Sequence, residues 1–338
     1  MLIGAAALIV VIAGMHAAAS LLVPFLLAAF VAIICLPPMR WLIARRVPAG
    51  LAVLSIALAL ILVTALIGIF LGTSIADFSH NLPAYQAHLQ QQTDAMLAWF
   101  SRHGLTLNSQ LLRDSLNPAV AMGLVGKMVA GLGNALANIF LIVLTVILLL
   151  IEGAALPNKW KLMGRHAPST ESFGRFVASV NSYLAIKGWV SLVTGVVIAI
   201  WLAVLGVDYP VLWGLIAFLF NFVPNIGSII AAVPALLLAL VQLGPGSALA
   251  AAAGYLVVNI VMGNVVEPRF MGKGVGLSTL VVFLSLVFWG WVLGPVGMLL
   301  SVPLTMVVKL ALEANPETRW IAVLIGPDVE PEPEASDS

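Results

Sequence analysis

The sequence predicts an all-α, polytopic membrane protein with about eight transmembrane helices and at least one re-entrant or broken helical hairpin. Hydrophobic residues make up 62% of its 338 residues and charged residues only 9%, whereas about a quarter of an average soluble chain is charged. Apolar windows that approach the roughly 20 residues needed to cross the hydrocarbon core recur along the whole chain. The solvent of most of these helices is therefore lipid.

Eight windows are expected to cross the membrane. In chain order they are Leu2–Met15, Leu21–Leu36, Leu51–Ile75, Leu132–Ile151, Gly188–Gly206, Ala248–Asn264, Leu277–Leu293 and Val296–Leu310. The first two form a tight pair joined by a short link of small residues, and the last two are short enough to be re-entrant instead. The first window has neither a basic flank nor a small-residue cleavage site, so it is interpreted as a short span and not as a signal peptide.

The distribution of lysine and arginine sets the expected orientation. The linkers Pro37–Pro48 and Glu152–Lys187 are rich in basic residues, which places both in the cytoplasm. The longer segment Asp77–Lys127 balances its acids and bases and belongs outside. The chain after Glu313 is acidic and is expected in the cytoplasm, so the C-terminus is cytoplasmic.

The segment Val211–Gln242 is expected to enter and leave the membrane on the external side. With Asp208 outside and Arg269 inside, only one of the two apolar stretches between them can cross. Ala248–Asn264 has an ordinary length, whereas Val211–Gln242 is too long for one span and is interrupted at Pro224. Irregular backbone at membrane depth is tolerated only where it is buried in protein or lines a cavity.

Five regions follow from these boundaries. They are N-terminal transmembrane helices at 1–75, an external amphipathic helical segment at 76–131, a transmembrane helix with a basic cytoplasmic segment at 132–187, a transport core with broken helices at 188–312, and an acidic, largely disordered cytoplasmic tail at 313–338. In the external segment, apolar residues at helical spacing between Leu82 and Phe100 predict an amphipathic helix. That helix packs either on its own protomer and the lipid interface or on another subunit.

Several function classes are excluded by what the sequence lacks. A formal net charge of +1 without a clustered basic face gives nucleic acid no electrostatic footprint. The single cysteine, Cys35, cannot form an intramolecular disulfide, and no Cys/His spacing suits zinc. The motifs GxSxG, HExxH and GxxxxGK[ST] are absent. We therefore expect no enzyme, no metal, no cofactor and no transport driven by ATP bound to this chain.

One candidate site lies where the segment Val211–Gln242 is interrupted. Pro224 removes an amide donor, Gly227 relaxes the backbone, and Ser228 is placed to cap a new helix. Asn221 and Asn225 supply donors and acceptors beside the partially positive end of that helix. These residues predict substrate recognition; the alternative is a proline kink whose asparagines bond to neighbouring helices.

The second candidate site is a charged group in the apolar second half. Ionisable residues within spanning regions are costly and usually face a bundle interior or a cavity. Glu267 precedes Pro268, which predicts a helix end with unpaired carbonyls beside a carboxylate, a set of groups suited to a cation or a polyol. Arg269 is then the expected partner of Glu267. The alternative is that these charges cap a helix at the cytoplasmic interface.

The second half also carries motifs that resemble a known family. They are Asp208-Tyr209-Pro210, Leu212-Trp213-Gly214, Asn221 to Ser228, Glu267 to Gly272, Gly276-Leu277-Ser278, Phe288 to Trp291, and Ser301 to Leu304. In this order, over about Gly153 to Glu313, they resemble the autoinducer-2 exporter (AI-2E) family, once catalogued as uncharacterised permeases. The family motifs fall on Pro224, Asn225, Gly227, Glu267, Pro268, Arg269 and Gly272.

The resemblance implies a bacterial inner-membrane protein of about eight spans. It would export the polyol-like quorum-sensing signal autoinducer-2 or, as in some members, exchange sodium for protons. The resemblance also implies a homo-oligomer, with a pentamer and an elevator-like motion suggested for the family. The lipid bilayer and the transported solute or ion are then the expected partners.

Three functions are carried forward. The first is a secondary transporter that exports a small polar or polyol-like solute. The second is a sodium/proton antiporter in which Glu267 titrates, although the paired intramembrane aspartates that would favour it are missing. The third is a membrane scaffold that transports nothing.

Overall fold

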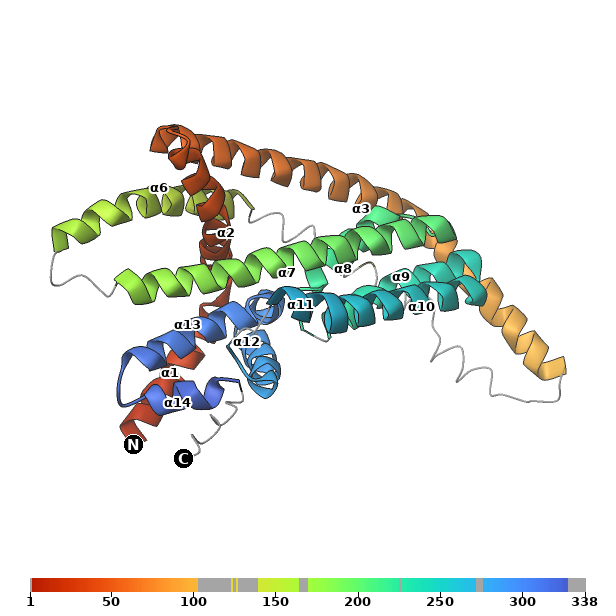
Figure 1. The fold of residues 1–338 in the computed structure, drawn as a ribbon. Coiled ribbons are helices and arrows are strands. Elements are labelled where there is room, and N and C mark those ends of the chain that lie inside the picture. The colour runs from red at the N-terminus through yellow and green to blue at the C-terminus, as the bar shows by residue number, and fades with distance from the viewer. Residues whose placement is uncertain are drawn as a thin grey trace, which may run out of the picture.

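The computed structural model describes residues 2–102, 139–163, 170–224, 226–271 and 276–327, together with Gly123 and Gly126. These residues form helices joined by turns, without a strand among them (Figure 1). In chain order the helices are α1 (Leu2–Ala17), α2 (Ala19–Ala44), α3 (Ala49–Arg102), α6 (Ile139–Met163), α7 (Thr170–Leu205), α8 (Pro210–Phe220), α9 (Gly227–Leu243), α10 (Pro245–Val261), the π-helix η2 (Met262–Val266), α11 (Glu267–Met271), α12 (Thr279–Leu299), α13 (Ser301–Ala314) and α14 (Arg319–Ile325).

The predicted class, an all-α polytopic membrane protein, is confirmed. Within the described residues, five helices are long and apolar enough to cross a membrane: Ala19–Ala44, Ala49–His88, Val177–Leu205, Pro245–Phe270 and Thr279–Leu299. Three shorter apolar helices accompany them: Ile139–Ala155, Pro210–Phe220 and Gly227–Leu243. Large apolar side chains stay exposed on these helices, among them Leu58 (65%) and Leu66 (59%). Such a surface is compatible with lipid and not with water.

The first two helices follow one another and do not fold back as the predicted tight pair would. Backbone hydrogen bonds continue across the joint, from the Ala18 amide to the Gly14 carbonyl (2.9 Å) and from the Leu22 amide to the Ala18 carbonyl (2.9 Å). Figure 1 shows α1 and α2 in succession, with α2 steeply inclined to α7. The link contains three successive alanines, and alanine has the highest helix propensity, so the chain continues as a helix instead of turning.

The third expected span and the start of the external segment are one helix, α3, of 54 residues. The expected boundary at 75/76 thus lies inside a helix. Phe78 and Tyr85 of α3 are buried in the same core cluster as Trp213 of α8. The Tyr85 hydroxyl also donates a 2.7 Å hydrogen bond to Asp208 Oδ2. Over this stretch α3 packs on its own protomer, which is one of the two arrangements that the sequence allowed.

Helices α8 and α9 form a helical hairpin, called the first hairpin below (Pro210–Leu243). The two helices pack on each other, and Pro224 lies in the turn between them. Their other ends also meet, because the Gln242 side-chain oxygen accepts a 3.0 Å hydrogen bond from the Asp208 amide. The predicted interruption of Val211–Gln242 is therefore a hairpin; its re-entry into the membrane stays a prediction.

The first hairpin is seated on α7 by a contact between backbones. A Cβ atom added to Gly214 of α8 would lie 2.5 Å from the Gly195 carbonyl oxygen of α7, and one added to Gly195 would lie 2.6 Å from the Gly214 carbonyl oxygen. Only two glycines allow this approach, because real Cβ atoms do not come so close to backbone oxygens. Small residues at such crossings are the usual means of close helix packing in membranes.

A second hairpin covers Thr279–Ala314. Helix α12 breaks at Gly294, whose φ of 70° and ψ of −156° lie outside the helical region and suit glycine. The chain then returns through α13, and the Trp289 indole N–H on the first arm donates a 3.0 Å hydrogen bond to the Thr305 hydroxyl oxygen on the second. The structure therefore shows the expected pair Leu277–Leu293 and Val296–Leu310 as two arms of one hairpin.

The open end of the second hairpin is closed by polar contacts and by α14. Lys309 Nζ donates a 2.6 Å hydrogen bond to the Gly276 carbonyl, and the Ser278 amide donates a 3.0 Å bond to the Ile325 carbonyl of α14. The region 313–338, expected to be a largely disordered tail, thus begins with a further packed helix. Its residues 328–338 lie outside the described part of the chain.

Candidate functional site

Helix α7 carries three polar side chains in line, and each meets a different part of the fold. Tyr183, Lys187 and Ser191 are spaced by four residues, which places them on one face of the helix. Tyr183 packs in one core cluster with Trp289 of the second hairpin. Lys187 contacts Glu267 of α11, and Ser191 contacts the inner end of the first hairpin. Along α7, Lys187 therefore lies between the levels at which the two hairpins pack.

The central contact is a largely buried ion pair between Lys187 and Glu267. Lys187 Nζ donates to both carboxylate oxygens, at 2.7 Å to Oε1 and 2.9 Å to Oε2. The Lys187 side chain is 6% exposed and that of Glu267 21% exposed. Charges removed from water to this degree cost several kcal/mol each unless they are paired, so each side chain depends on the other.

The chain reaches Glu267 through a π-helix and does not end there. The predicted helix end before Pro268 is wrong: α10 passes through η2 directly into α11. The Glu267 amide bonds to the Met262 carbonyl, five residues back instead of four. The wider turn accommodates a proline ring that would clash with an ordinary preceding turn, and π-bulges of this kind are frequent at functional sites.

Arg269 is not the partner of Glu267. The predicted pairing required the helix to break at Pro268, and on the continuous helix two residues in sequence point in different directions. Arg269 is exposed, as is Pro268, whereas Glu267 turns inward to α7. Lys187, 80 positions away in sequence, supplies the countercharge instead.

The inner end of the first hairpin supplies a second polar pair. Asn221 is the C-cap residue of α8, and its Nδ2 donates a 2.9 Å hydrogen bond to Ser191 Oγ. Ser191 is fully buried. This is the bond between neighbouring helices that the sequence analysis gave as the alternative to substrate binding. It also brings Asn221 to the face of α7 that carries the ion pair, one helical turn from Lys187.

The turn of the first hairpin differs from its prediction in one detail. Ser228 was expected to cap the new helix, but α9 begins at Gly227 with Ile226 as its N-cap residue, and no side chain bonds to the first-turn amides. Gly227 is required, because an added Cβ would overlap the Phe220 carbonyl oxygen. Pro224 and Ser228 are partly buried. The predicted site residues Asn225 and Gly272 lie outside the described residues.

Comparison with known proteins decides the family. The sequence profile of the AI-2E family transporters matches residues 6–317. The chain belongs to the AI-2E transporter family. The match covers both halves of this AI-2E transporter, well beyond the stretch from Gly153 to Glu313 that carries the recognisable motifs.

Several curated relatives are similar over nearly the whole chain. The AI-2 transport protein TqsA of Escherichia coli K12 is 42% identical over 319 residues, which cover 94% of this chain and 93% of TqsA. A putative transport protein of Haemophilus influenzae is 40% identical over 97% of this chain and 96% of its own length. The putative transport protein YhhT of Escherichia coli K12 is 38% identical over 95% and 93%. This chain is therefore a membrane protein of a transporter family.

Two residues of the candidate site in this AI-2E transporter were missed by sequence reasoning. Lys187 was counted with the basic residues of the cytoplasmic segment, and Ser191 was hidden in the apolar window Gly188–Gly206. The sequence did hold one signal. Lys187 directly precedes the charge-free window Gly188–Gly206, with no loop between them. The helix begins at Thr170 and carries Lys187 inward by more than four turns.

Together the two pairs give the site a mixed set of hydrogen-bonding groups in apolar surroundings. Lys187 is a donor, ionised Glu267 is an acceptor, and Ser191 and Asn221 can do both. One helical turn separates Lys187 from Ser191, so their Cβ atoms lie about 5–6 Å apart. A small solute with several hydroxyl groups matches this spacing and this mixture.

Proposed function

We propose that this AI-2E transporter exports a small polar or polyol-like solute by secondary transport, and that Lys187, Glu267, Ser191 and Asn221 bind the solute. The observation that carries the proposal is the buried Lys187–Glu267 ion pair, located between two helical hairpins in a chain with few charges. Autoinducer-2 is the first candidate solute, because a relative with 42% identity is named an AI-2 transport protein.

The charge balance of the site favours a neutral solute. The Lys187–Glu267 ion pair has no net charge, so a neutral polyol can enter without a counterion. Its hydroxyl groups can exchange for the contacts that the four side chains make with each other, which keeps every buried polar group bonded. A polyol lacking one of these hydroxyls would leave a protein group unpaired and would bind less tightly.

Sodium/proton antiport through Glu267 is the alternative, and the ion pair argues against it. A sodium ion at this carboxylate would have to displace an ammonium group held at 2.7 Å and 2.9 Å. The displaced Lys187 would then be left buried without a countercharge, at a cost of several kcal/mol. If the protein were a scaffold that transports nothing, the two polar pairs, Lys187–Glu267 and Ser191–Asn221, would have no reason to lie together between the hairpins.

We further propose that the protein lies in the bacterial inner membrane with a cytoplasmic C-terminus, and that the first hairpin is re-entrant from the external side. The basic flanks at Pro37–Pro48 and beyond Glu152 support this orientation. The meeting of both ends of the first hairpin, at Asp208 and Gln242, supports re-entry. The homo-oligomer implied by family resemblance is part of the same proposal.

The test is transport in everted membrane vesicles, in which export appears as uptake. Autoinducer-2, sodium and protons are measured side by side for the wild type and for Glu267→Gln, Ser191→Ala and Asn221→Ala. We expect saturable autoinducer-2 uptake that falls at least tenfold in Glu267→Gln and severalfold in the other two variants, with no sodium-dependent proton movement. Sodium/proton exchange abolished by Glu267→Gln would instead establish the antiporter.

Thr194→Val is the matched control on α7. Thr194 is buried like Ser191, but its hydroxyl bonds to the Val190 carbonyl of its own helix at 2.8 Å. We expect Thr194→Val to transport at the wild-type rate while Ser191→Ala does not. Equal rates in all variants and the wild type, at equal protein levels, would show that these residues only hold helices together.

A further inference from the structure

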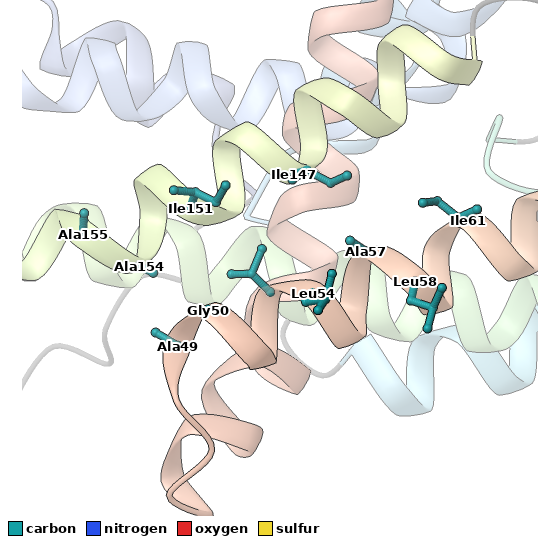
Figure 2. A pocket seen from close by; sticks show the side chains of 11 residues that line it. Ala49, Gly50, Leu54, Ala57, Leu58, Ile61, Ile147, Ile151, Ala154 and Ala155 are labelled. Atoms are coloured by element: carbon teal, nitrogen blue, oxygen red, sulfur yellow. The ribbon is translucent and has the colours of Figure 1, made fainter.

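A wide apolar groove lies between α3 and α6, away from the polar site of α7. Its volume is about 590 Å³. The eleven lining residues are all apolar or small, and they come from the first four turns of α3 and from Ile147–Ala155 of α6. Figure 2 shows Ala154 and Ala155 at the same end of the groove as Ala49 and Gly50, so the two helices run in opposite directions along it.

The groove walls are exposed. Leu54 is 63% exposed, and Leu58 and Ile151, one on each helix, are similarly open. The Cβ position of Gly50 has no atom within 4 Å. The described part of the chain therefore leaves this groove unfilled, and a hydrocarbon chain is the chemistry that its lining matches.

One end of the groove carries two arginines. The turn that leads into α3 places Arg45 and Arg46 just before Ala49, and no carboxylate among the described residues forms an ion pair with either arginine. Both side chains are exposed. Arg45 stacks over the Trp41 ring at 4.0 Å. On α6, Glu152 follows the lining residue Ile151 and has an interaction of its own.

Arg46 occupies a position that normally belongs to glycine. Its φ is 67°, and its amide bonds to the Ile43 carbonyl while the Val47 amide bonds to the Leu42 carbonyl, which is the Schellman pattern at a helix end. A side chain in this left-handed conformation costs about 1–2 kcal/mol. An arginine is therefore a costly choice for the turn alone. Its exposed guanidinium is placed to bind an anion.

The first turn of α3 adds a second attraction for an anion. It begins at Ala49 and Gly50, both exposed, and contains no acidic residue. The free amide groups of a helix N-terminus carry partial positive charge and bind phosphate readily. The cationic turn, the N-terminus of α3 and the first residues that line the apolar groove are thus only a few positions apart in the sequence.

We propose that this groove binds an anionic phospholipid, with an acyl chain between α3 and α6 and the headgroup phosphate at Arg46 and the N-terminus of α3. A second copy of the chain is the poorer occupant. Acidic residues number only 14 in 338, so an apolar helix of a second copy would fill the groove but bring few carboxylates to Arg45 and Arg46. One anionic lipid molecule would both neutralise the two arginines and fill the groove with its acyl chain.

The experiment uses the full-length protein in nanodiscs of phosphatidylcholine, with phosphatidylglycerol titrated in and bound lipid counted by native mass spectrometry. We expect the wild type to retain phosphatidylglycerol over phosphatidylcholine. Arg46→Gly removes the charge and relieves the strained φ, so it should keep or raise stability while weakening phosphatidylglycerol binding about fivefold, the equivalent of about 1 kcal/mol per basic residue. Arg40→Gln removes a charge from α2 before the turn and is the control.

A second pair of variants tests the apolar half. Gly50→Leu should fill the groove and lower lipid retention at least severalfold. Gly68→Leu is its control: Gly68 lies on the same helix, has equal room for a side chain and does not line the groove. Equal retention of both lipids in the wild type would overturn the proposal. So would lipid retention unchanged in Gly50→Leu with a loss of oligomer, because that result would assign the groove to a second copy.

Discussion

Breaking the Lys187–Glu267 pair from one side should destabilise the protein, and the two sides should not be equivalent. Removing one partner of a buried ion pair costs about 3–5 kcal/mol, because the other charge stays buried. Glu267→Met leaves Lys187, which is 6% exposed, whereas Lys187→Met leaves Glu267, which is 21% exposed and within reach of water. Glu267→Met should therefore lie near the upper end of this range and Lys187→Met near the lower end.

The double variant separates stability from transport. Lys187→Met with Glu267→Met replaces both charges by apolar side chains of similar length, and such replacements are often neutral or stabilising. We expect it to recover most of the wild-type free energy of unfolding, so that the coupling energy in the double-mutant cycle is about 3 kcal/mol or more. Transport of the polar solute should stay absent, because the site has lost its donor and its acceptor.

The two readouts are the denaturant midpoint of the purified protein and uptake by everted vesicles at matched protein levels. The reasoning would be refuted by a double variant that is restored in both, since the pair would then contribute only to packing. It would also fail if Lys187→Met were much more damaging to stability than Glu267→Met. That order would mean that the carboxylate, and not the ammonium group, is the more deeply buried charge in the membrane.

Three further predictions concern the first hairpin and its contact with α3. In a Cys35→Ser background, single cysteines at Asp208 and Ser247 should react alike with an impermeant maleimide added outside; opposite accessibility would show that the segment between them crosses the membrane. Tyr85→Phe removes a hydrogen bond to a carboxylate and should lower the free energy of unfolding by about 1.5–3 kcal/mol, measured by denaturant titration; a change below 0.5 kcal/mol would contradict the contact. Gly227→Ala should lower the yield of folded protein in size-exclusion chromatography, because its Cβ overlaps the preceding helix; a wild-type profile would show that the turn is looser than described.

Hydropathy predicted the fold class because lipid imposes one strong rule on the chain: spans must be long, apolar and helical. The same rule made interruptions visible. Pro224 and Gly227 marked the turn of the first hairpin, and Gly294 with Pro295 marked that of the second. The two prolines lack an amide donor, Gly294 has a left-handed φ, and Gly227 leaves no room for a Cβ atom, and residues of these two types stand out in a sequence.

The errors arose where local signals compete with packing. Pro268 reads as a helix end, yet one π-turn accommodates it and α10 continues through Glu267. The external segment reads as a separate region, yet α3 runs on through Pro83 to Arg102, with Phe78 and Tyr85 packed in the core beside Trp213. Lys187 reads as a cytoplasmic charge, because its pairing partner is 80 residues away and no periodicity links them.

The location of the ion pair favours a working site over a structural clamp. Two apolar side chains would stabilise the contact between α7 and α11 at least as well as the ion pair does, because no charge would have to be desolvated. Nor does the pair join the hairpins to α7, because Gly195 and Gly214 bring α8 into place and the cluster around Trp289 brings the second hairpin. What the pair adds is a donor and an acceptor that neutralise each other and that, in the proposed function, a solute would bond with. Any shift of the first hairpin along α7 would break the bond between Asn221 and Ser191 one turn away. If the proposed site binds the solute, binding and hairpin position would be coupled through adjacent turns of α7.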